Sequence, residues 1–425
     1  MNFTKTILPN GLRLITVPMK DNPSVTVLVM VEAGSKYESK NINGLSHFLE
    51  HMVFKGTPRR PKATDISREL DGLGAQYNAF TGQEYTGYYA KVAAQQLDKA
   101  LDIVSDLYLN PMFPVEEIER EKGVIVEEIR MYQDMPHRDV HDVLSALIHG
   151  DQPAGWSIAG TEDHVRSFTR EQLITYRSEH YVSQATTVVV AGSFDESTIQ
   201  TQVEKLFGSL SVSAKKGKDK VIEKQDVPRF VIKHKETDQA HVAIGVRSFS
   251  LFDPRIPVMN VMMTVLGKGM SSRLFSKMRD QLGICYYVNA GHDTYTDHGN
   301  VVLAAGVDVS RLGEAVKGIM EECIRLKTEP VGEAELEKAK NYMIGTTMLE
   351  LETSEARSEF VGSQEILKGK VQTLEESIAK IRAVTSSDIQ KLAQEIFVDQ
   401  HLNMAMVGNV KDDSAFKSDF TFAAK

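Results

Sequence analysis

The segment Phe168-Thr-Arg-Glu-Gln-Leu-Ile-Thr-Tyr-Arg-Ser-Glu-His-Tyr-Val-Ser-Gln184 leads into an apolar run that ends at Gly192. A second copy lies 216 residues further on, where Val384-Thr-Ser-Ser-Asp-Ile-Gln-Lys-Leu-Ala-Gln-Glu-Ile-Phe-Val-Asp-Gln400 leads to Gly408 without a gap. Each copy has the pattern of a capped helix, a short loop and a strand that ends at glycine. Ungapped agreement over about 25 residues indicates a duplication, so the sequence predicts two related halves.

A polar stretch marks the join between the halves. Residues 209–220 are rich in Ser, Lys and Gly, which is typical of a solvated linker. We therefore expect a first half at 1–213, a linker at 214–227 and a second half at 228–425. Each half opens with β-rich segments and continues with apolar residues at helical spacing. The predicted fold class is α+β, with two homologous halves that are each a mainly antiparallel sheet packed with helices.

The composition excludes several classes of protein. The chain has 425 residues and a net charge of −9, so it lacks the basic footprint of a nucleic-acid-binding protein. Its apolar runs are far shorter than the roughly 20 residues that cross a bilayer, and we expect no membrane span. The N-terminus lacks a basic region followed by an apolar one, which favours a cytoplasmic location. With only two cysteines, any metal must be held by histidine and carboxylate.

The segment His47-Phe-Leu-Glu50-His51 lies in a stretch with helical apolar spacing. His47 and His51 are four residues apart, so both imidazoles project from one helix face and suit a single zinc ion. Glu50 reaches the same face, where a carboxylate can take a proton from a zinc-bound water. Such a trio also occurs by chance on a solvated helix. A structural zinc is disfavoured, since a closed site needs four protein ligands and no idle glutamate.

A third zinc ligand is expected from the helix predicted at 114–132. Glu121 and Glu128 are two turns apart on one face of this helix, whereas Glu127 points about 100° away and is expected to face outward. We assign Glu128 as the third ligand and Glu121 as a partner that orients a ligand or tunes the metal. The alternative for Glu121 is an ordinary ion pair with Lys122 or Arg120.

The first half resembles the zinc peptidases of the pitrilysin/insulinase family. The resemblance is carried by Gly44-Leu-Ser-His47-Phe-Leu-Glu50-His51-Met-Val-Phe-Lys-Gly-Thr57, and by the spacing of 77 positions from His51 to Glu128. It extends along essentially the whole chain. The short-chain branch, which includes the mitochondrial processing peptidase β-subunit and bacterial processing-protease-like proteins, is the most similar. The resemblance implies a zinc metalloendopeptidase in which His47, His51 and Glu128 bind zinc and Glu50 is the general base.

Further site residues follow from the resemblance. Asn78 and Ala79 match the family's substrate-pairing strand, where an open sheet edge would bind an extended peptide; a plain hairpin edge is the alternative. Arg279 and Tyr286 match the family's Arg-x6-Tyr signature, and would hold a peptide carbonyl and donate to a developing oxyanion. The alternative is a structural arginine and a core tyrosine, and Tyr287 leaves the choice of tyrosine open.

The repeat predicts one zinc ion per chain, because the second half lacks the ligands. At the offset of 216, the positions of His47, Glu50, His51 and Glu128 fall on Met263, Leu266, Gly267 and Ile344.

The resemblance implies a chamber enclosed by homologous halves, and two halves per chain imply a dimer that encloses peptides or unfolded segments. A homodimer is the simpler expectation. A heterodimer with an inactive homologous partner stays open. So does a non-proteolytic structural or assembly subunit, although such family members generally lose site residues.

Overall fold

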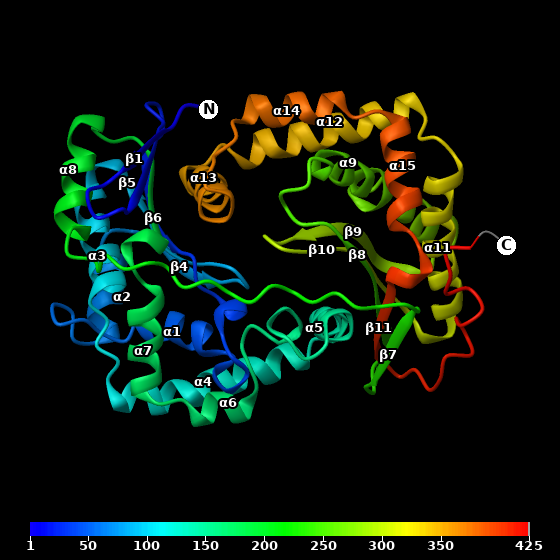
Figure 1. Ribbon diagram of the computed structural model, residues 1–425, viewed down its shortest axis with the longest axis horizontal. Helices are drawn as coiled ribbons and strands as arrows, with labels where there is room; N and C mark the ends of the chain where they lie inside the picture. Colours follow the sequence, from blue (N-terminus) through cyan, green and yellow to red (C-terminus); the bar gives the residue numbers. More distant parts are fainter. Residues whose placement is uncertain (424–425) are drawn as a thin grey trace. The chain divides into compact units, whose positions relative to one another are not determined.

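The computed structural model describes residues 1–423, which form two compact units. Unit 1 comprises Met1–Ile129, Ser157–Asp219 and Met348–Glu375. Unit 2 comprises Arg130–Trp156, Lys220–Thr347 and the chain from Glu376 onward. Figure 1 shows the helices and strands of both units, coloured by their position along the chain.

Unit 1 is built on a six-stranded sheet with the order β1-β2-β6-β3-β5-β4, in which β2 and β6 are parallel and the other neighbours antiparallel. Its strands are β1 (Thr4–Ile7), β2 (Arg13–Pro18), β3 (Ser24–Val31), β4 (Gln76–Thr81), β5 (Thr86–Ala93) and β6 (Thr186–Gly192). Its helices are α1 (Leu45–Val53), α2 (Ala63–Gly72), α3 (Leu97–Leu109), α6 (Glu162–Ser167), α7 (Arg170–His180), α8 (Glu196–Phe207) and α13 (Ser354–Lys368). Strand β4 is one free edge of this sheet.

Alternating side chains of β3 explain why the first sheet is covered on both faces. Val25, Val27 and Val29 pack into the larger core with α1 and α3, whereas Leu28 and Met30 pack into the core beneath α13. Because successive side chains of a strand point to opposite faces, an apolar run such as β3 must be buried on both sides.

Unit 2 is built on a five-stranded sheet with the order β7-β11-β8-β10-β9, in which β11 and β7 are parallel and the other neighbours antiparallel. Its strands are β7 (Arg229–His234), β8 (Gln239–Ser248), β9 (Cys285–Thr294), β10 (Gly299–Asp308) and β11 (Leu402–Gly408). Its helices are α5 (Pro136–His149), α9 (Ile256–Gly267), α10 (Arg273–Phe275), α11 (Leu312–Thr328) and α15 (Ser386–Ile396). The remaining helices, α4 (Val115–Gln133), α12 (Glu333–Glu350) and α14 (Leu374–Ala383), are divided between the two units.

The predicted repeat and the α+β fold class are confirmed. Helices α7 and α15, and strands β6 and β11, begin and end 216 residues apart. Both helices start with a capping box, at Thr169 and Thr385. The compact units do not follow the linear order of the predicted halves, because α5 packs on the sheet of unit 2 and α13 on the sheet of unit 1. Apolar spacing predicts that each helix has a buried face, but not which sheet it covers.

The lysine-rich stretch that the sequence predicts as a solvated linker is tied to unit 1 along part of its length. Lys215 pairs with Glu32 at 2.6 Å, and Lys218 pairs with the buried Glu84 at 3.1 Å. Within residues 1–423, no helix is both long and apolar enough to cross a membrane.

Candidate metal centre

A buried carboxylate holds the start of helix α1. The helix begins after Gly44, whose φ of 100° lies in the left-handed region that favours glycine. Glu38 accepts hydrogen bonds from the backbone N–H groups of Gly44 at 2.8 Å and Ser46 at 2.6 Å. A carboxylate at a helix N-terminus satisfies free N–H groups and complements the helix dipole. Burial raises the pKa of Glu38 to about 7, although the bonds from Ser46 and Gly44 oppose the rise.

Helix α1 has one apolar face and one polar face. Its apolar face enters the larger core of unit 1 through Leu45, Phe48, Leu49, Met52 and Val53. The other face carries His47, Glu50 and His51, none of which is fully buried. The core therefore fixes the helix and presents both imidazoles on one side.

The structure brings His47 and His51 together with Glu128 of α4. The Oε2 atom of Glu128 lies 3.6 Å from Nε2 of His47 and 3.4 Å from Nε2 of His51. Two tetrahedral ligands that are each about 2.0–2.1 Å from one zinc ion lie about 3.4 Å apart. Among residues 1–423 this is the one group of three such side chains with ligand atoms within 4.8 Å. The donor set and its spacing therefore fit a zinc ion.

Glu121 lies behind His51, on the side of the ring away from Glu128. Its Oε1 atom is 2.8 Å from Nδ1 of His51, and its Oε2 atom is 2.6 Å from Nζ of Lys55. The alternative ion pairs expected for Glu121 do not form, because Arg120 bonds to Glu117 and Lys122 bonds to Glu119. Glu127 is exposed, as its direction on the helix predicts. The geometry suits Glu121 to orienting His51.

The two histidines differ in charge when no metal is bound. Burial lowers the pKa of His47 to about 4, so its imidazole is neutral. Burial also acts to lower the pKa of His51, but its bonds with Glu121 and Glu128 prevail and raise it to about 9. A metal ion binds a neutral ring nitrogen, so binding at this group would release the proton of His51.

Glu50 is held by Thr81, the last residue of the edge strand β4. The Oγ1 hydroxyl of Thr81 donates to Oε2 of Glu50 at 2.5 Å. Burial raises the pKa of Glu50, and the Thr81 hydrogen bond works against that rise. On the same strand the backbone N–H of Ala79 donates to the side-chain Oδ1 of Asn78 at 2.9 Å. The strand at the edge of the sheet is therefore also the strand that contacts the glutamate.

Arg279 and Tyr286 lie in unit 2 and contact each other. Arg279, within the π-helical turn Ser276–Gln281, donates to the backbone carbonyl of Tyr286, and its guanidinium carbon lies 5.7 Å from the centre of the tyrosine ring. Tyr286 is 73% exposed, whereas the hydroxyl of Tyr287 is 3.0 Å from Nδ1 of His241. Of the two tyrosines, Tyr286 is therefore the one whose ring is open to a ligand.

The sequence patterns do not predict the roles of Glu38, Lys55 and Thr81. Two of them carry signals in the sequence, because Lys55 is one helical turn beyond His51 and Thr81 is two strand residues beyond Ala79. Glu38 has no comparable periodicity, since it precedes the helix and folds back onto it.

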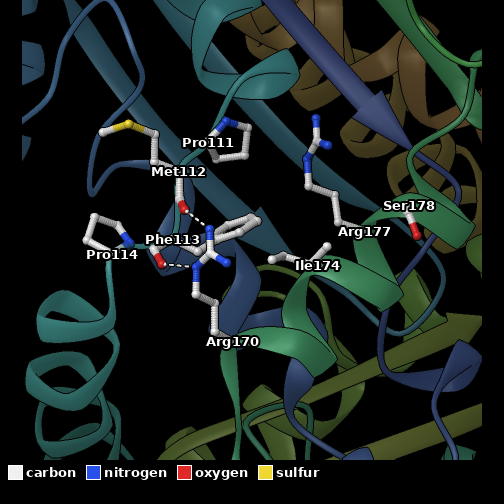
Figure 2. A pocket seen from close by; sticks show the side chains of 8 residues that line it. All are labelled: Pro111, Met112, Phe113, Pro114, Arg170, Ile174, Arg177 and Ser178. Carbon is white, nitrogen blue, oxygen red and sulfur yellow. Dashed lines mark hydrogen bonds between the residues drawn. The ribbon is translucent and has the colours of Figure 1, made fainter.

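A separate pocket of about 560 Å³ lies in unit 1 between residues 111–114 and helix α7 (Figure 2). Arg170 donates to the carbonyls of Phe113 at 2.9 Å and Met112 at 3.1 Å, as the dashed lines of Figure 2 show. Arg177 likewise donates to backbone carbonyls at the end of α3. None of the predicted site residues lines this pocket, and its two arginines donate hydrogen bonds to backbone carbonyls.

Two family models match the chain. The model described as insulinase, peptidase family M16, matches residues 13–162. The model described as the inactive domain of peptidase M16 matches residues 167–343.

Relatives match over most of their length. The chain is 37% identical to the uncharacterized zinc protease YmxG of Bacillus subtilis, covering 92% of this chain and 95% of the relative. It is 32% identical to an uncharacterized zinc protease of Streptomyces coelicolor, covering 97% and 90%. Among solved structures, a protease from Helicobacter pylori shares the fold with a TM-score of 0.88 at 22% identity, covering 96% of this chain and 99% of that one.

Proposed function

The chain belongs to the insulinase family of zinc peptidases, family M16, and on that premise we propose that it is an endopeptidase that hydrolyses bonds within peptides or unfolded segments. The observation that carries the proposal is the convergence of His47, His51 and Glu128 beside Glu50. Three protein ligands leave one position open, which is the arrangement of catalytic rather than structural zinc.

In this proposal one zinc ion per chain is held by His47, His51 and Glu128, and Glu121 fixes the ring of His51 through Nδ1. The bound metal supplies Lewis acidity to the attacking water and to the peptide carbonyl. Glu50 accepts a proton from the water while the oxygen of that water forms a bond to the carbonyl carbon. When the C–N bond breaks, Glu50 returns the proton to the leaving amine, so one water yields one carboxyl and one amino terminus.

The substrate is proposed to add as an extended strand to the free edge of β4, with Ala79 pairing through its backbone and Asn78 through its amide. Arg279 and Tyr286 are proposed to hold a peptide carbonyl and to donate to the developing oxyanion. We further propose that the chain works as a homodimer that encloses its substrate. A mass in solution of one chain, measured by light scattering, would contradict the dimer, and co-purification with an inactive homologue would favour a heterodimer.

The decisive experiment is digestion of a diverse library of unstructured peptides, read by mass spectrometry, with zinc-loaded wild type and Glu50→Gln. We expect the variant to keep its zinc and to lose activity by roughly 10²–10⁴-fold, the usual worth of a general base. If the wild type with stoichiometric zinc cleaves no peptide, the peptidase proposal is wrong and the assembly-subunit alternative gains support.

A further inference from the structure

The hydrogen bond between Thr81 and Glu50 links the substrate-binding edge to the general base. Within residues 1–423, the Thr81 hydroxyl is the one hydrogen-bond donor to the Glu50 carboxylate. We propose that Thr81 is a positioning residue that holds Glu50 in its productive orientation, an inference that rests on the function proposed above.

The backbone of β4 aims Thr81 at α1. Since strand side chains alternate, Tyr77, Ala79 and Thr81 share one face, and Tyr77 and Ala79 pack against the core that contains α1. Phe80 faces the opposite core, beneath α13. Thr81 therefore meets Glu50 because of its strand register.

The hydroxyl is held rigidly. Threonine is branched at Cβ, which restricts its χ1 rotation. Thr81 also pairs across the sheet with Thr86, whose own hydroxyl donates to the carbonyl of Ala33 at 2.9 Å. A fixed donor to one oxygen of Glu50 sets the plane of the carboxylate and leaves the other oxygen to accept a proton from water.

Strand β4 would thus both bind the peptide and hold Glu50 in place. A peptide that pairs with Ala79 binds two residues from Thr81, which is about 7 Å along the strand. The peptide and the carboxylate that serves it are therefore positioned by one short length of backbone, and misplacement by an ångström lowers rates steeply.

The test compares Thr81→Val, which keeps the shape and removes the hydroxyl, with Thr81→Ser, which keeps the hydroxyl. Thr6→Val in β1, the opposite edge strand, is the matched control. For Thr81→Val we expect unchanged zinc content and KM but a kcat lowered about tenfold or more, as for loss of a hydrogen bond to a charged group. Thr81→Ser should keep at least half of the kcat. A wild-type kcat in Thr81→Val, or equal losses in Val and Ser variants, would overturn the proposal.

Crystal structures of the zinc-loaded proteins separate this inference from the proposed function. We expect one Glu50 rotamer in wild type and Thr81→Ser, and a displaced or multiple rotamer in Thr81→Val. If no protein cleaves peptides yet the rotamers behave in this way, the peptidase proposal fails while the positioning role stands. An unchanged Glu50 in Thr81→Val would refute the positioning role whatever the activity.

Discussion

Helix α1 of unit 1 and helix α9 of unit 2 occupy overlapping places in the repeat but present different surfaces. Helix α1 buries one face and turns His47, Glu50 and His51 away from the core. Helix α9 is buried almost all round in its second half, where Met263, Leu266 and Gly267 stand at the offset of the metal-site residues.

The difference extends to the space beside each helix. A Cβ atom on Gly267 would lie 2.3 Å from the backbone nitrogen of Ala290 in β9, so no side chain fits there without a shift of backbone. At the position that corresponds to Glu128, Ile344 is buried. Glu337, which corresponds to Glu121, pairs with Lys340 and Arg382 instead. Unit 2 therefore has closely packed residues at the positions where unit 1 has metal ligands and an open helix face.

The largest expected effect concerns the ligand that unit 2 lacks. Glu128→Gln should lower zinc affinity several-hundredfold, or about 3–4 kcal/mol, since structural zinc sites gain roughly 10–16 kcal/mol from about four ligands. Competition with a chromophoric chelator measures the affinity, and elemental analysis should find one zinc per wild-type chain.

Glu127→Gln and Glu337→Gln are the matched controls and should bind zinc like wild type. If Glu127→Gln loses zinc and Glu128→Gln does not, the third ligand is Glu127 rather than Glu128. A second tightly bound zinc per wild-type chain would show that unit 2 has not lost its metal.

The sequence allows the repeat and much of the metal group to be predicted, because both depend on local spacing. The offset of 216 places α15 and β11 correctly, and the helical period puts Glu128 on the same face as Glu121. Local spacing does not predict that α5 packs on the sheet of unit 2 and α13 on the sheet of unit 1. Any apolar sheet face can cover the apolar stripe of a helix. Nor is the bond from Thr81 to Glu50, which depends on how β4 packs against α1.

The starts of the two helices should respond to pH with opposite sign. The folded-state pKa of Glu38 is about 7, above its ordinary value of 4.5. Its contribution to stability is therefore fully present below pH 4.5 and is lost as the pH rises through 7. Before α9, a hydrogen bond from Arg255 lowers the pKa of Asp253 from its ordinary value of 3.8, so that carboxylate stabilises the fold above pH 3.8 and loses this effect as the pH falls below it.

The measurement is the free energy of urea unfolding of the metal-free chain between pH 4.5 and 7.5. Relative to Glu38→Gln, the wild type should lose about 3 kcal/mol across this range, from 1.36 kcal/mol per pKa unit. Relative to Asp253→Asn, the stability of the wild type should stay nearly level across this range, because Asp253 loses its stabilising effect only below its ordinary pKa of 3.8. Parallel pH curves for wild type and Glu38→Gln would mean that Glu38 does not titrate in this range.

The smallest expected effect tests whether the scaffold of unit 2 still has room for a metal-binding side chain. Gly267→Ala adds a methyl group against the backbone of Ala290, and overpacking of this kind costs about 2 kcal/mol. Gly291→Ala, in the same strand as Ala290 but with open space around its Cβ, is the control and should be neutral or slightly stabilising. Chemical denaturation of both variants gives the two free energies of unfolding.

If Gly267→Ala is as stable as wild type, the backbone of β9 shifts at little cost, and unit 2 differs from unit 1 in its ligands alone. A selective loss in Gly267→Ala means instead that the packing of α9 on β9 closed the face, so that restoring the histidines and glutamates would not restore the site.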